Sequence, residues 1–80
     1  MPTTQERLFK VIAEQFGYDV NAITLDSDFK RDMHGDELDE VELVMAIEDE
    51  FDVVIPDDEG LAFTTPAKAL EWLTTNGVAA

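Results

Sequence analysis

Apolar residues recur at helical spacing near the start of the chain, between recognisable helix ends. The positions that share one helical face are Leu8, Val11, Ile12 and Phe16. Their i, i+3, i+4 spacing is typical of an amphipathic α-helix. Thr3 and Glu6 have the spacing of a capping box, and Gly17 stands where a left-handed C-terminal cap is expected. The pattern therefore predicts a first helix over residues 3–16.

A second helical pattern begins near Asp36, which can cap a helix, with Asp39 at the reciprocal position of a capping box. The residues expected to point inward are Leu43, Val44, Ile47 and Phe51. A neighbouring stripe adds Leu38, Val41 and Met45. Two stripes are wider than a single buried face requires, so we expect part of the second stripe to be accessible to solvent.

The remaining segments complete a small bundle. Residues 18–35 show no sustained period and form a long loop. We expect three apolar side chains to pin this loop onto the core: Ile23, Leu25 and Phe29. Acidic residues suit the first turn of a short third helix over residues 57–63, and a Thr-Pro pair begins a fourth over residues 65–77. The fold class is therefore all-α: a four-helix bundle with a long loop between its first two helices, in one domain over residues 1–80.

Charge is distributed very unevenly along this pattern. Residues 32–59 contain thirteen acidic residues and no Lys or Arg, so this segment accounts for almost all of the net charge of −14. Apolar residues are threaded through it, whereas a solvated acidic tail would lack them. We therefore expect a folded helix that presents a negative face to a positively charged partner. A sequence pI near 4.1 argues against nucleic acid as a direct partner, because phosphates would be repelled.

Composition also limits the chemistry. The chain has no Cys, so disulfides, thiolate metal sites and cysteine nucleophiles are excluded. No apolar run approaches the roughly 18 residues of a membrane span, and the N-terminus lacks the pattern of a signal peptide. We therefore expect a cytoplasmic monomer without a membrane span.

Each candidate for a catalytic or metal-binding residue lacks the neighbouring groups that such a site requires. His34 is the single His, and it lies in a loop without a Ser or Cys nearby to activate. We expect nearly all of the carboxylates to face solvent, which leaves no pair in unlike environments for acid–base work. A calcium loop starting at Asp32 would need glycine where Glu37 stands and a carboxylate where Leu43 stands. We therefore predict no catalytic residue and no metal site, and hence no enzyme.

Three segments closely resemble the bacterial acyl carrier proteins of fatty-acid and polyketide synthesis. They run from Phe29 to Met33, from Asp36 to Asp52 and from Ile55 to Asp57. The likeness covers residues 4–75 and implies the same four-helix bundle. In this family a phosphopantetheine arm holds an acyl chain as a thioester, and the acidic second helix docks onto basic surfaces of partner enzymes such as synthases or acyltransferases. By position, the residues that match the recognition surface are Asp36, Leu38, Asp39, Val41, Glu42, Met45, Glu48 and Asp49.

One departure from the family bears on function. The family attaches its arm to the serine of an Asp-Ser-Leu motif, where this chain has Asp36-Glu37-Leu38. A carboxylate cannot form the phosphodiester that joins the arm to a hydroxyl, so we expect no phosphopantetheine here. Glu37 has two interpretations: a first-turn acid that stabilises a helix start by about 0.3–1 kcal/mol, or an imitation of the phosphate of a loaded arm. His34, where the family commonly has glycine, is a smaller departure.

Three functions are compatible with these features. The first is an acidic docking module, related to acyl carrier proteins, that binds partner enzymes without carrying an arm. The second is a true acyl carrier whose serine has been replaced, naturally or by engineering. The third is an acidic mimic that blocks a nucleic-acid-binding surface. The apolar stripe of Leu38, Val41 and Met45 argues against this mimic, which would need charge alone.

Overall fold

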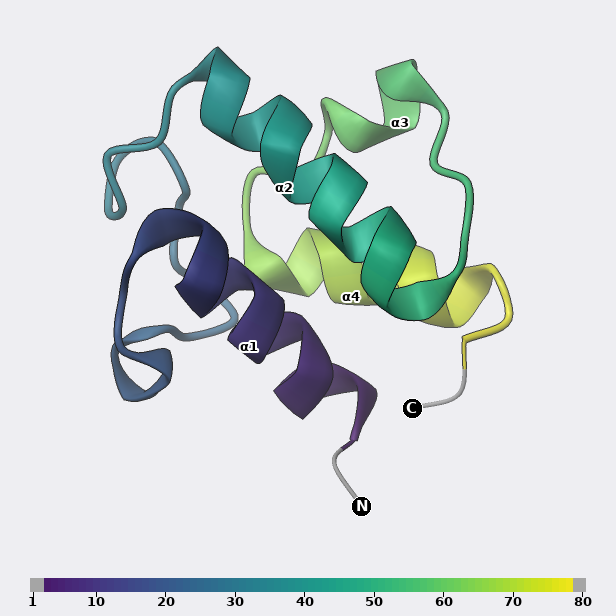
Figure 1. Cartoon of the computed structure of the whole chain (residues 1–80), viewed down its shortest axis with the longest axis horizontal. Coiled ribbons are helices and arrows are strands. Elements are labelled where there is room, and N and C mark those ends of the chain that lie inside the picture. Colours follow the sequence, from purple (N-terminus) through teal and green to yellow (C-terminus); the bar gives the residue numbers. More distant parts are fainter. Residues whose placement is uncertain (1–2, 79–80) are drawn as a thin grey trace.

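The computed structural model describes residues 3–78, which form helices and connecting loops without a strand. The elements are α1 (Thr4–Phe16), a 3₁₀ turn η1 (Val20–Ala22), α2 (Glu37–Phe51), α3 (Asp57–Gly60) and α4 (Pro66–Thr75). α1 packs against α2 and α4, and α3 packs against α2 (Figure 1). The predicted all-α fold with four helices and a long first loop is confirmed.

Local capping explains where the two longest helices begin. The Thr3 hydroxyl accepts from the Glu6 N–H at 3.1 Å, and the Glu6 carboxylate accepts from the Thr3 N–H at 3.3 Å. The Asp36 carboxylate likewise accepts from the Asp39 N–H at 2.9 Å, while Asp39 accepts from the Asp36 N–H at 3.0 Å. Gly17 ends α1 with a φ of 71°, in the left-handed region that glycine adopts without strain. Both predicted capping boxes are therefore confirmed.

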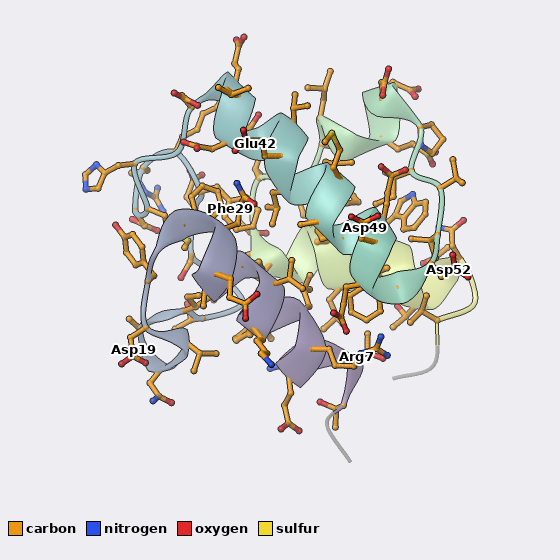
Figure 2. The ribbon with its side chains drawn as sticks, viewed as in Figure 1. Arg7, Asp19, Phe29, Glu42, Asp49 and Asp52 are labelled. Atoms are coloured by element: carbon orange, nitrogen blue, oxygen red, sulfur yellow. The ribbon has the colours of Figure 1, made fainter. Side chains whose placement is uncertain are left out.

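The core draws side chains from α1, α2, α4 and the long loop. Its largest fully buried members are Phe29, Leu8, Ile12, Leu43, Ile47, Leu73 and Pro66. Phe29 stacks on Phe16 at 5.5 Å between ring centroids, and its backbone N–H donates to the Thr64 carbonyl at 3.0 Å. Figure 2 places Phe29 behind the end of α1. The loop is therefore a packed part of the core, which fixes the path of the chain toward α2.

Two sequence-based expectations about connecting segments were wrong. The side chain of Leu25 is exposed, and this residue contacts α4 through its backbone instead: its carbonyl accepts from the Ala67 N–H at 3.0 Å. α3 ends at Gly60 rather than near Phe63. The Phe63 N–H donates to the Gly60 carbonyl three residues earlier, which tightens the chain into a turn and buries the Phe63 ring.

Candidate functional site

The outward side of α2 carries apolar and acidic side chains together. Burial of Leu43 and Ile47 turns the opposite side of the helix to solvent. Three apolar residues are exposed there, with exposed fractions of 65% for Leu38, 50% for Val41 and 56% for Met45. The expectation that this second stripe is accessible is confirmed. An exposed apolar stripe flanked by charge is typical of a surface that contacts another molecule.

Acidic residues surround this stripe, and several of them also make contacts within the fold. Asp36 and Asp39 form the capping box, while Asp49 is exposed along α2 (Figure 2). Glu42 is exposed too, and its carboxylate accepts from the Gln15 side-chain amide of α1 at 2.9 Å. We define the α2 face as the exposed residues Asp36, Glu37, Leu38, Val41, Glu42, Met45 and Asp49.

Glu48 differs from the other acidic residues that the sequence placed on the recognition surface. Its side chain is half-buried, and its carboxylate accepts from the Ile55 backbone N–H at 2.8 Å. Ile55 is itself buried in the core just before α3. Glu48 therefore holds the segment between α2 and α3 against α2. Helical spacing does not predict this contact, because it depends on the path of the chain after α2.

Glu40 is the buried exception among the described carboxylates, which we expected to face solvent with few exceptions. Only 8% of its surface is exposed, and the ammonium of Lys30 lies 3.9 Å from its carboxylate. Helical spacing could have identified this residue, because Glu40 stands three and seven positions before the buried Leu43 and Ile47. The charge of Glu40 favoured an exposed position, whereas its place on the helix favoured a buried one.

Glu40 lines a groove between α2 and α3. The groove has a volume of about 360 Å³ and is lined by Glu40, Val41, Val44, Met45, Glu48, Asp57, Gly60 and Leu61. The two helices approach closely at Gly60, where an added Cβ would lie 3.0 Å from a methyl carbon of Val44. The groove therefore continues the exposed side of α2 around to α3.

The loop before α2 is held by backbone hydrogen bonds to two aspartates. The Asp28 carboxylate accepts from the N–H groups of Arg31 and Lys30, each at 2.9 Å, and these bonds lower the pKa of Asp28. The Asp32 carboxylate accepts from the Asp28 N–H at 2.8 Å and from the Arg31 guanidinium at 3.3 Å, which lowers the pKa of Asp32. These two carboxylates therefore stabilise the loop in their charged forms.

The last residues before α2 are constrained in a different way. His34 is an exposed loop residue, as expected, with a left-handed φ of 56°. At Gly35 an added Cβ would lie 2.7 Å from the Phe16 ring and 2.9 Å from the Phe29 carbonyl oxygen. Only glycine fits this approach, so packing against Phe16 and Phe29 fixes where α2 starts. Glu37, the first residue of α2, is exposed at that start.

Within residues 3–78, no three His, Asp or Glu side chains are grouped so that they could hold a metal ion. None of the helices described is long and apolar enough to cross a membrane.

Comparison with known families agrees with this geometry. Residues 6–73 match the family described as phosphopantetheine attachment site (PP-binding). The match runs from α1 into α4 and so includes the whole of α2 and α3. Domains of this family normally carry a phosphopantetheine arm; they are not enzymes themselves but carry acyl groups for partner enzymes. The predicted likeness to an acyl carrier and the prediction of no enzymatic activity are thereby confirmed, and the chain belongs to the phosphopantetheine attachment site family of carrier domains.

Proposed function

We propose that this chain is an acyl-carrier-like docking module. It binds basic surfaces of partner enzymes, such as synthases or acyltransferases, through α2, and it carries no phosphopantetheine arm. The single observation that carries this proposal is Glu37 exposed at the first position of α2, beside an apolar and acidic α2 face. The proposed recognition residues are Asp36, Leu38, Asp39, Val41, Glu42, Met45, Glu48 and Asp49.

The residues at the start of α2 do not fit a phosphopantetheine arm. The arm is joined to an alcohol oxygen through a phosphodiester, and the side chain of Glu37 ends in a carboxylate. The Ser27 hydroxyl lies within the long loop, where it accepts from the Thr24 N–H at 3.0 Å. It belongs to a turn and not to the start of α2. We therefore derive no step of the proposed function from an arm.

Charge and shape support docking through α2. The thirteen acidic residues of positions 32–59 create a negative field that attracts a basic surface from a distance. Once the surfaces meet, Leu38, Val41 and Met45 are already exposed and can bury apolar area against the partner. Charge thus determines the rate of encounter, and the apolar stripe determines how long the complex persists.

The binding test uses an acyl-carrier-dependent synthase immobilised for surface plasmon resonance. We expect the association rate to fall about tenfold between roughly 50 and 500 mM NaCl, because salt screens the charges that steer association. Glu42→Gln combined with Asp49→Asn should lower the association rate more than it raises the dissociation rate. The matched control combines Glu14→Gln with Glu71→Gln, which removes the same charge from exposed positions on α1 and α4. Equal association rates for the two double variants would contradict docking through α2.

A second candidate, a true acyl carrier with a replaced serine, is favoured by the family match over residues 6–73. Both candidates use the same α2 face and differ in whether an arm is needed for activity in the partner's pathway. Activity of the unaltered chain in the partner's pathway separates them: the docking module is active without an arm, whereas a carrier whose serine has been replaced is active only after Glu37→Ser restores loading.

A further inference from the structure

Asn76 and Gly77 lie together at the C-terminal end of α4. The chain has two Asn residues, Asn21 and Asn76, and only Asn76 is followed by Gly. Asn76 is the C-cap of α4 and is exposed, and Gly77 follows it with a left-handed φ of 94°. A Cβ added at Gly77 would meet no atom of a non-neighbouring residue within 4 Å. The backbone amide that follows the Asn76 side chain is therefore sterically open.

An Asn side chain followed by Gly can lose its amide through reaction with its own backbone. The Gly77 nitrogen, after loss of its proton to hydroxide, attacks the side-chain carbonyl carbon (Cγ) of Asn76. A C–N bond forms, the bond from Cγ to Nδ2 breaks, and Nδ2 takes a proton from water and leaves as ammonia. Water then opens the resulting succinimide ring at either carbonyl and gives aspartate or isoaspartate. Glycine favours ring closure because it has no Cβ to obstruct it and adopts most backbone angles.

The folded end of α4 holds both reacting groups apart. The Asn76 Nδ2 donates to the Trp72 carbonyl at 2.8 Å, and the Gly77 N–H donates to the Thr74 carbonyl at 3.3 Å. A ψ of 22° at Asn76 directs the Gly77 nitrogen away from the Asn76 Cβ. Ring closure therefore requires both hydrogen bonds to open and the backbone to rotate. Such local opening at an exposed helix end costs less free energy than global unfolding.

The product of this reaction cannot replace the contacts of Asn76. A carboxylate has no N–H donor for the Trp72 carbonyl, and its charge lies beside the last carbonyls of α4, where the helix dipole is negative. Isoaspartate also lengthens the backbone by one carbon atom before Gly77. This extra atom disturbs the bond from the Val78 N–H to the carbonyl of the fully buried Leu73, at 2.9 Å. The modification therefore loosens the last turn of α4.

We propose that Asn76 is a deamidation site, that opening of the last turn of α4 controls its reaction, and that the product is a less stable form of the chain. Water is the co-reactant, and hydroxide is the base. Asn21 is the natural comparison, because Ala22 follows it with a Cβ and donates its N–H to the Asp19 carbonyl at 2.9 Å. The site includes no residue of the α2 face, so it is independent of docking through that face.

The test incubates the whole chain in mildly alkaline buffer, with and without concentrated urea. Peptide mapping by mass spectrometry follows Asn21 and Asn76 over time. We expect Asn76 to convert in both conditions, about tenfold more slowly without urea, because two hydrogen bonds must open first. Asn21 should stay unchanged in buffer while Asn76 converts. Equal rates with and without urea would overturn the control by α4, and equal conversion of the two Asn residues in buffer would overturn the site.

A change at Val78 tests the control by α4 without altering the reacting pair. Val78 is partly buried against the core, so Val78→Ser should ease opening of the helix end. We expect the rate in buffer to rise about threefold while the rate in urea stays the same. Thr75→Ser, at an exposed position, is the control and should change neither rate. A Val78→Ser rate in buffer equal to that of the unaltered chain would contradict the proposed control. Circular dichroism confirms folding, and the urea comparison on the unaltered chain decides the matter if Val78→Ser does not fold.

The stability of the product is tested separately. Asn76→Asp has the sequence of the aspartate product, and we expect its melting temperature to fall by about 4 °C, because a donor is lost and a charge opposes the helix dipole. Asn21→Asp adds the same charge in η1 and should lower the melting temperature by less than half as much. Equal shifts in the two variants would mean that net charge alone matters, and the proposed loosening of α4 would be rejected.

Discussion

The two ends of α2 carry similar charge but use it differently. At the start, Glu37 and Glu42 are exposed. At the end, Glu48 bonds the Ile55 backbone, and Glu50 receives two hydrogen bonds from Arg7 of α1, one to its carboxylate and one to its carbonyl. The comparison teaches that acidity alone does not identify a binding residue. Glu48 and Glu50 near the end of α2 hold neighbouring segments in place, while Glu37 at the start is open to solvent.

Removal of the Glu48 carboxylate should give the largest loss of stability among these acids. Glu48→Ala leaves the part-buried Ile55 N–H without its acceptor, which we expect to lower the free energy of unfolding by about 1–3 kcal/mol. Asp49→Ala, one residue along, should change it by less than about 0.5 kcal/mol. Urea denaturation of both variants measures the difference. Equal losses in the two variants would contradict the proposed difference between Glu48 and Asp49. Glu48→Gln keeps an acceptor oxygen and should therefore recover most of the stability.

Arg7 of α1 contacts the end of α2, and its removal should lower the free energy of unfolding by an intermediate amount. Its guanidinium lies 4.5 Å from the centroid of the Phe51 ring and donates to Glu50 at 2.9 and 2.8 Å. Arg7→Met keeps an aliphatic side chain and removes these contacts, so we expect a loss of about 1–2 kcal/mol. Lys10→Met, the same change of charge at an exposed position of α1, is the control. Thermal melts that place both variants at the same midpoint would show that Arg7 does not link α1 to α2.

The smallest effect concerns the loop that leads to the start of α2. The pKa values of Asp28 and Asp32 are lowered in the folded protein from an ordinary value of 3.8, so their contribution to stability is present above that value. It is lost as pH falls through the folded pKa values, below about pH 4. Asp28→Asn combined with Asp32→Asn should therefore make the decline in melting temperature below about pH 4 shallower. An unchanged acid limb in the double variant would contradict this role.

Helix starts could be predicted from sequence because they depend on neighbours along the chain. The Thr3–Glu6 and Asp36–Asp39 boxes each join residues three positions apart, and both were predicted. The end of α3 depends instead on where Phe63 meets the core, which no local pattern records. Tertiary packing decided that boundary.

The candidate site divides in the same way. The exposed stripe of Leu38, Val41 and Met45 followed from the width of the apolar pattern on one helix. The contact of Glu48 with Ile55 depends on the path of the chain after α2 and could not be predicted. Helical spacing places Glu40 on the buried side of α2, but its charge led us to expect it in solvent.

We propose that the chain keeps a carrier's docking surface and lacks only the acceptor for an arm. The most direct test of this proposal is Glu37→Ser, which places a hydroxyl at the exposed first position of α2. Folding should be little affected, because the change removes a dipole contribution of about 0.5 kcal/mol. Both proteins are incubated with coenzyme A and a broad-specificity phosphopantetheinyl transferase, and intact mass spectrometry is the readout. We predict that the serine variant gains one phosphopantetheine and the parent chain gains none; modification of the parent, or a folded variant that stays unmodified, would contradict the claim.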